Sequence, residues 1–262
     1  MREAGVEVVF SDLPHADGSP RLFWLRTSLM PRFLAVARAM NDRGWVLKVE
    51  DAYRTPAMQR ALGTRPALFA AILEKVHLHL SPLPSAFSLL HHIFSLLQVL
   101  WEYSGDRATP SREELASLLI ARTGSLIAAA PKVGTHMSGS AIDISVLHRG
   151  SGEEVDRGAP YLELSELTPM ASPFISAEAA ANRREITALF AAQGFLDYPW
   201  EFWHYSAGDA YEGLLKETGK PGQYGAVELE VGSGAVAPMA DPTVRHPLAL
   251  QLLLASLRRG FA

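Results

Sequence analysis

The chain of 262 residues contains no cysteine. This absence excludes disulfides, thiolate metal ligands and a cysteine nucleophile, so any bound metal would depend on His, Asp and Glu. Runs of lysine and arginine are also missing, and the formal net charge is -4. Because such a charge balance attracts neither nucleic acid nor an anionic membrane, we expect neither as a partner. A small or neutral substrate fits this composition better.

Long apolar runs are scarce as well. The N-terminus has no basic stretch followed by an apolar segment, so we expect no secretory signal and a cytoplasmic protein. The most apolar stretch, residues 86–101, is about 16 residues long and shorter than the roughly 20 that a membrane span needs. It is typical of a buried helix or of a surface for self-association, and we predict no membrane span.

The order of predicted elements indicates an α+β fold. Apolar spacing and turn residues predict helices over 27–44, from Thr55-Pro56 onward, over most of 66–130, over 177–194 and over 248–257, and strands over 45–50, 141–146 and within 195–205. We therefore expect one domain spanning 1–262, with helices on one side of a central, mainly antiparallel sheet.

A histidine and an aspartate lie in a loop of small residues. His136 and Asp143 stand seven positions apart, and the residues between them are mostly Ser, Gly and Ala. Such a loop can fold tightly enough for both side chains to reach one ion, although taken alone it is more typical of an ordinary hydrogen-bonded turn. A catalytic zinc needs three such ligands and one position left open to water.

A second motif places Glu201 three residues before His204 in an aromatic segment. Burying both side chains among tryptophan, phenylalanine and tyrosine is costly unless they are paired or bind a metal. In the functional interpretation His204 is the third ligand and Glu201 is the general base that takes a proton from water. In the alternative, Glu201 faces solvent and His204 binds the backbone.

Arg54 follows a predicted strand and precedes a predicted helix, in the segment Asp51-Ala52-Tyr53-Arg54. A guanidinium fixed there would stabilise the oxyanion that forms during amide hydrolysis. By itself Arg54 is more typical of a surface ion pair, and only the combination of the three motifs favours catalysis.

Together these motifs resemble the zinc D-alanyl-D-alanine dipeptidase and carboxypeptidase family, which includes the vancomycin-resistance dipeptidases. The resemblance rests on Gly134-x-His136-x-x-Gly139-x-Ala141-x-Asp143, Glu201-x-Trp203-His204 and Asp51-x-Tyr53-Arg54, and on further short matches over most of the chain. Residues 70–108 are the main exception, and we interpret them as a helical insertion.

The resemblance implies an antiparallel sheet flanked by helices and Zn2+ bound by His136, Asp143 and His204. It also implies Glu201 as general base and then acid, and Arg54 beside the developing oxyanion. The family has a serine where this chain has Gly134, so a hydroxyl near the substrate is missing unless Ser138 or Thr135 supplies it. Tyr161 and Trp203 are expected to shape the pocket.

The position expected to bind the substrate's ammonium also differs. Members of the dipeptidase branch that this chain resembles have the pattern G-x-x-F-D-x-F/M-x-E after the zinc-binding aspartate. This chain has Leu162 where that pattern has its own aspartate. Glu163 would supply the charge if a strand there shifts its register by one residue, since otherwise the side chain faces the opposite way. If it does not, the substrate lacks a free amine at that point.

Three functions follow as hypotheses. The first is a D-Ala-D-Ala-type dipeptidase involved in cell-wall peptidoglycan metabolism. The second is a D,D-carboxypeptidase that acts on longer peptidoglycan stem peptides, which Leu162 would favour. The third is a catalytically silent binding module that keeps its zinc, against which the presence of Glu201 and Arg54 counts.

Overall fold

The computed structural model describes residues 5–16, 18–62, 135–217, 219–230 and 232–240. Nearly all of these residues belong to one compact unit, Met1–Gln59 with Ala130–Arg245. The other unit, Arg60–Ala129 with His246–Ala262, falls almost entirely outside the described residues. The predicted insertion at 70–108 and the predicted last helix at 248–257 therefore lie outside the described part, as does Gly134.

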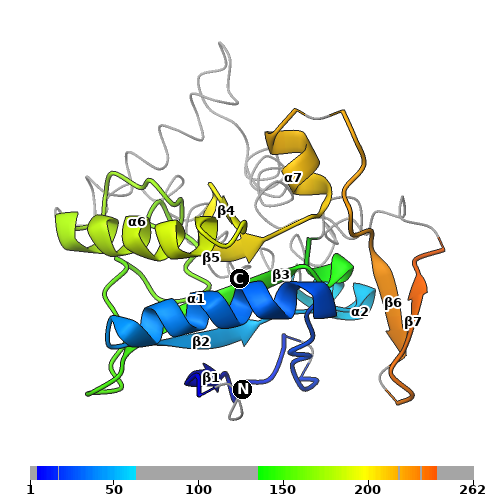
Figure 1. The fold of residues 1–262 in the computed structure, drawn as a ribbon, viewed down its shortest axis with the longest axis horizontal. Coiled ribbons are helices and arrows are strands. Elements are labelled where there is room, and N and C mark those ends of the chain that lie inside the picture. The colour runs from blue at the N-terminus through cyan, green and yellow to red at the C-terminus, as the bar shows by residue number, and fades with distance from the viewer. Residues whose placement is uncertain (1–4, 17, 63–134, 218, 231, 241–262) are drawn as a thin grey trace, which may run out of the picture. The chain divides into compact units, whose positions relative to one another are not determined.

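Figure 1 shows the described elements as a sheet with helices along it. In chain order they are β1 (Val8–Phe10), the 3-10 helix η2 (Thr27–Leu29), α1 (Met30–Asp42), β2 (Trp45–Asp51), α2 (Pro56–Leu62), the 3-10 helix η3 (Thr135–Ser138), β3 (Ala141–His148), α6 (Ala177–Ala191), β4 (Leu196–Tyr198), β5 (Glu201–Ser206), α7 (Ala210–Leu215), β6 (Val227–Glu230) and β7 (Ala235–Pro238).

The main sheet has the strand order β1-β2-β3-β5-β4. Only the β1–β2 pair is parallel, and the other three pairs are antiparallel. This mixed, mostly antiparallel sheet confirms the predicted α+β class. Its register brings Asp51 of β2 opposite Asp143 of β3, and Asp143 opposite His204 of β5. Three polar residues therefore form one row across neighbouring strands.

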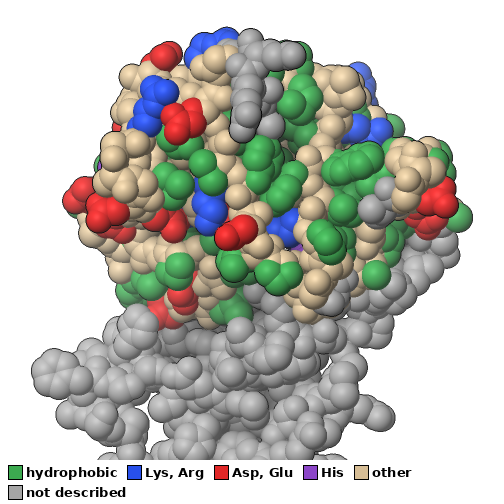
Figure 2. Space-filling view, turned by 90° about the horizontal axis from the view of Figure 1, so that it is seen from below, with side chains coloured by type: hydrophobic (Ala, Val, Ile, Leu, Met, Phe, Trp, Pro, Cys, Tyr) green, Lys and Arg blue, Asp and Glu red, His purple; other side chains and the backbone are tan. Residues whose placement is uncertain are grey.

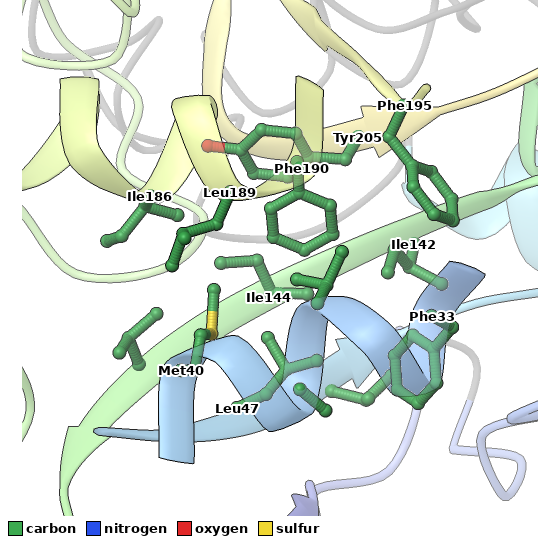
Figure 3. Packing of buried hydrophobic residues seen from close by; sticks show 14 of the residues in the cluster. Phe33, Met40, Leu47, Ile142, Ile144, Ile186, Leu189, Phe190, Phe195 and Tyr205 are labelled. Atoms are coloured by element: carbon green, nitrogen blue, oxygen red, sulfur yellow. The ribbon is translucent and has the colours of Figure 1, made fainter. Parts of the chain in front are cut away.

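The hydrophobic core fills the space between the sheet and two helices, α1 and α6. Figure 3 shows Phe33 and Met40 of α1 and Phe190 of α6 pointing toward Ile142 and Ile144 of β3. Because side chains alternate along a strand, Asp143 between these two isoleucines points to the opposite face. The core on one face thus fixes the polar row on the other.

Local signals in the sequence explain where the helices begin and end. The hydroxyl of Thr55 accepts a hydrogen bond from the Met58 amide at the start of α2, as the Thr-Pro pair predicted. Ser176 caps α6 in the same way. α6 ends at Ala191, three residues earlier than predicted, and Gly194 closes the turn with a φ of 76°, a conformation that favours glycine.

Among the described residues, no helix is both long and apolar enough to cross a bilayer. On the face shown in Figure 2, acidic and basic side chains alternate with hydrophobic ones, and neither sign of charge forms a continuous patch there.

Packing around Phe190 generates a stability prediction. The Phe190 ring is fully buried, stacks on Tyr205 with centroids 3.9 Å apart and meets Phe195 edge-on. Phe190→Ala should lower the free energy of unfolding by about 3–5 kcal/mol because it removes these contacts and leaves a cavity. Chemical denaturation measures this loss.

The matched control is Val236→Ala on the exposed strand β7, which should change the free energy of unfolding by no more than about 0.5 kcal/mol. Equal effects of the two substitutions would contradict the packing described here.

Candidate metal centre

Three buried side chains from three elements converge on one point. His136 comes from η3, Asp143 from β3 and His204 from β5, and each has one ligand atom within 4.8 Å of the other two. All three residues are at most 4% exposed. They form a buried triad that could hold a metal ion.

The spacing of the donor atoms fits a tetrahedral ion. Nε2 of His136 lies 3.1 Å from both Oδ1 of Asp143 and Nδ1 of His204, and these two atoms are 3.0 Å apart. Ligands at 2.0–2.1 Å from a tetrahedral ion would stand about 3.3 Å from one another. The triangle of donors is therefore close to the required size before any side chain moves.

Both imidazoles are oriented by a second hydrogen bond. Nδ1 of His136 donates to the carbonyl of Ala52, 2.5 Å away, so the lone pair of Nε2 is directed toward the other donors. In His204 the roles of the nitrogens are reversed, because Nε2 lies 2.9 Å from the hydroxyl of Thr135 and leaves Nδ1 for the centre. Such partners fix the tautomer and the ring orientation of a metal-binding histidine.

Asp143 uses its two oxygens differently. Oδ1 faces the histidines, whereas Oδ2 accepts hydrogen bonds from Nη2 of Arg54 and from the Tyr161 hydroxyl at 3.2 Å. Burial opposes ionisation of Asp143, but the adjacent His136 and Arg54 outweigh it and hold the carboxyl pKa well below its usual range. Burial, together with the charge of Asp143, raises the pKa of the Tyr161 hydroxyl, so this group stays protonated and donates.

Arg54 is buried beside this centre, although an arginine at such a position was more typical of the surface. Its Nε donates to Asp51 at 2.8 Å, and its Nη1 donates to Gln59 at 3.3 Å. Burial alone would lower the guanidinium pKa, but the carboxylates of Asp51 and Asp143 outweigh it and raise that pKa. Arg54 is therefore a fixed positive charge in contact with a residue of the triad.

Asp51 is the centre of a buried charge cluster that the sequence did not reveal. Its Oδ2 lies 2.8 Å from Nε of Arg54, 3.1 Å from Nη1 of Arg21 and 3.8 Å from Nε2 of His15. The spacing of Asp51 and Arg54 within one motif hinted at their pairing. Nothing local marked Arg21 or His15, which the loop before α1 brings back to the sheet.

Glu201 occupies the first position of β5 and is partly buried. It is paired with Tyr198 across the β4–β5 turn, and its charge is the second cause, after burial, of the raised pKa of the Tyr198 hydroxyl. The Tyr198 ring in turn meets the His204 ring edge-on at 5.6 Å. Glu201 therefore shares a neighbour with His204.

The expected substrate contacts are placed as follows. The Trp203 and Tyr161 rings meet edge-on at 5.6 Å, next to Asp143. The Ser138 hydroxyl is buried and used within its own loop, where it donates to the Thr135 carbonyl and contacts the hydroxyl of Ser140.

The segment around Glu163 is a turn and not a strand, so the strand register assumed for Glu163 is wrong. The Glu163 amide donates to the Pro160 carbonyl at 3.3 Å, and Leu162 has a φ of 66°. Such a left-handed residue is required at the third position of a type II turn and is uncommon for leucine. The alternation of faces along a strand therefore does not decide where Glu163 points. Glu163 as a whole is partly buried.

The charge cluster generates a stability prediction. Asp51→Ala should lower the free energy of unfolding by about 3–5 kcal/mol, because it leaves the buried guanidiniums of Arg54 and Arg21 without their shared partner. Thermal or chemical denaturation of the metal-free protein measures the change.

Glu185→Ala is the matched control, since it removes the exposed ion pair with Arg43 and should cost at most about 1 kcal/mol. A loss at Asp51 as small as that of the control would show that the cluster is not buried as described.

Comparison with known proteins identifies related sequences. The Peptidase M15 family model, described as D-Ala-D-Ala dipeptidase, matches residues 109–219, which include the triad and Glu201. The D-alanyl-D-alanine dipeptidase of Enterococcus faecium is 35% identical over 71 residues, which are 27% of this chain and 35% of that enzyme. The enzyme of the same name from Enterococcus faecalis is 32% identical over 71 residues, which are again 27% of this chain and 35% of that enzyme.

A third D-alanyl-D-alanine dipeptidase, from Streptomyces coelicolor, is 29% identical over 89 residues, or 34% of this chain and 40% of that enzyme. The matched segments thus span between about a third and two fifths of the relatives' length. The part of the chain that builds the buried triad, within residues 109–219, is thus similar to the peptidase M15 family of D-Ala-D-Ala dipeptidases.

Proposed function

We propose that this protein is a zinc-dependent hydrolase that cleaves D-Ala-D-Ala-type dipeptides. The observation that carries the proposal is the triangle of donor atoms of His136, Asp143 and His204, separated by 3.0–3.1 Å, in which each residue also has a second partner that holds it in place. The match of residues 109–219 to the Peptidase M15 family model supports the reaction class.

Zinc is the ion that this donor set favours. Two imidazole nitrogens and one carboxylate oxygen in a tetrahedral arrangement are typical of catalytic zinc, whereas calcium and magnesium prefer oxygen ligands in larger numbers. Bound there, zinc would polarise the scissile carbonyl and lower the pKa of water. In this proposal the protein's own residues move the protons and stabilise the charges.

Glu201 is the proton-transfer residue in this proposal. It takes a proton from the attacking water and delivers it to the nitrogen of the leaving amino acid, so that one carboxylate serves first as base and then as acid. Its proximity to Tyr198, which contacts His204, supports a place at the edge of the triad.

Arg54 supplies positive charge where the carbonyl oxygen becomes negative. Its guanidinium has five N–H donors, of which three are committed to Asp51, Asp143 and Gln59. The remaining donors are available to a substrate oxygen. Because these three partners already fix the group, it would need little reorganisation during the reaction.

Tyr161 and Trp203 form an aromatic wall beside Asp143. In this proposal the wall contacts the side chains of the substrate. Glu163 is the candidate partner for a substrate ammonium. Its turn is held by Thr168, whose hydroxyl donates to the Glu163 carbonyl at 2.8 Å.

A carboxypeptidase acting on longer stem peptides is the second candidate. The observation that favours it is Leu162, an apolar residue held in a left-handed conformation beside Tyr161. A pocket without a carboxylate there would accept a peptide whose amine is already acylated.

Metal loading and substrate choice test the function directly. The zinc-loaded protein should release D-alanine from D-Ala-D-Ala, and removal of the metal with a chelator should abolish the release until zinc is restored. Faster cleavage of a stem pentapeptide than of the dipeptide would favour the carboxypeptidase. Absence of turnover for the dipeptide, its analogues and the pentapeptide would refute both.

Replacement of the proposed base separates binding from chemistry. Glu201→Gln should lower kcat by about 10²–10⁴-fold because the amide cannot accept the proton of water, while bound zinc, measured by metal analysis, stays at one per chain. Glu178→Gln, an exposed change at the start of α6, is the control and should leave kcat unchanged. Undiminished turnover by Glu201→Gln would exclude this role.

A further inference from the structure

The loop from Arg157 to Met170 carries Tyr161 and Glu163 but contains no helix or strand. Its backbone carbonyls therefore need partners from elsewhere, because buried carbonyls without hydrogen bonds are costly. Much of this requirement is met by one side chain of α6.

Arg183 of α6 is that side chain. Its Nε donates to the Arg157 carbonyl at 2.7 Å, its Nη2 to the Leu167 carbonyl at 2.9 Å and its Nη1 to the Pro169 carbonyl at 2.7 Å. A single guanidinium thus joins both ends of the loop. Only the planar, five-donor geometry of arginine can serve such divergent acceptors from one position, and lysine cannot.

The same guanidinium also connects the loop to β5. Its Cζ lies 3.9 Å from the ring centroid of Phe202, and Cζ of Arg157 lies 4.8 Å from the same ring. Phe202 stands between Glu201 and Trp203. Two cations stacked on one buried ring therefore fix the loop relative to the strand that carries the proposed base.

Arg157 extends this connection to the strand that carries Asp143. Its Nη1 donates to the carbonyl of Ile144, the neighbour of Asp143, at 2.9 Å. Two backbone hydrogen bonds add to this contact: the Phe202 amide of β5 donates to the Thr168 carbonyl, and the Met170 amide donates to the Pro199 carbonyl in the turn between β4 and β5. The Arg157–Phe202–Arg183 cluster thus joins β3, β5 and the loop that carries Tyr161.

Stability alone is a poor explanation for this arrangement. Arg183 is 2% exposed, and its burial together with the charge of Arg157 lowers its pKa to about 10, so it remains a cation at neutral pH. Replacing buried charges with well-packed apolar side chains is often neutral or stabilising. What an apolar residue cannot do is bind three separated carbonyls and hold one loop conformation.

We propose that Arg183 is a positioning residue for substrate binding, which acts by holding the loop from Arg157 to Met170, with Tyr161 and Glu163, in its working place beside the metal centre. The proposal rests on the proposed function for the identity of the substrate. The positioning itself is a property of the loop that is measurable without turnover.

The test compares Arg183→Lys with Arg184→Lys in the zinc-loaded chain of 262 residues. Arg184 is the adjacent residue of the same helix and is exposed. The same arginine-to-lysine change at this position is therefore the control. Hydrogen exchange followed by mass spectrometry should be faster in Arg183→Lys within 158–170 and unchanged in β3. For D-Ala-D-Ala, kcat/KM should fall about 10- to 100-fold, mainly through KM, because a misplaced loop weakens substrate binding while the metal stays bound.

A second variant separates positioning from folding. Arg183→Ala should lose the same activity, and added ethylguanidinium should restore part of it and slow exchange in 158–170, because the small cation can occupy the vacated site. If Arg183→Lys lowers the free energy of unfolding yet leaves loop exchange and KM equal to those of Arg184→Lys, Arg183 is only structural and the proposal is wrong. If the wild type cleaves no dipeptide, the proposed function fails, and the exchange comparison alone still decides the positioning role.

Discussion

The two oxygens of Asp143 face in different directions, and the rest of the site depends on this division. Oδ1 meets the two histidines, while Oδ2 binds Arg54 and Tyr161. The carboxylate thus links the candidate metal position to the guanidinium and to the aromatic wall. Asp143 can serve both groups only because β3 holds it in the middle of the sheet, between Asp51 on one side and His204 on the other.

Burial of so many charges is possible because the sheet separates its two faces. Isoleucines on either side of Asp143 pack against α1 and α6, and the alternation of the strand sends the carboxylate to the opposite face. There, two guanidiniums balance two carboxylates: Arg54 and Arg21 face Asp51, and Arg54 also faces Asp143. The apolar packing thus fixes the backbone, so that the polar side chains on the other face stay within contact distance of one another.

Regular elements were predictable where local signals agree. The pattern of β2 and the Thr-Pro start of α2 are local properties of the chain, and both were predicted. Two details were not. The helix α6 ends three residues early, because Gly194 closes it. The segment at Leu162 forms a turn, because the fold tolerates a left-handed leucine that no local rule would predict.

By itself, the sequence excluded a thiolate ligand and predicted that His136, Asp143 and His204 form one candidate metal set, since residue types and motif spacing are properties of the chain alone. Only the tertiary structure decided that Arg54 is buried, that Arg21 and His15 join Asp51, and that Arg183 binds the loop of Tyr161. The physical reason is separation along the chain. Partners dozens of residues apart leave no local pattern, and strand register and loop paths bring them together only when the chain is folded.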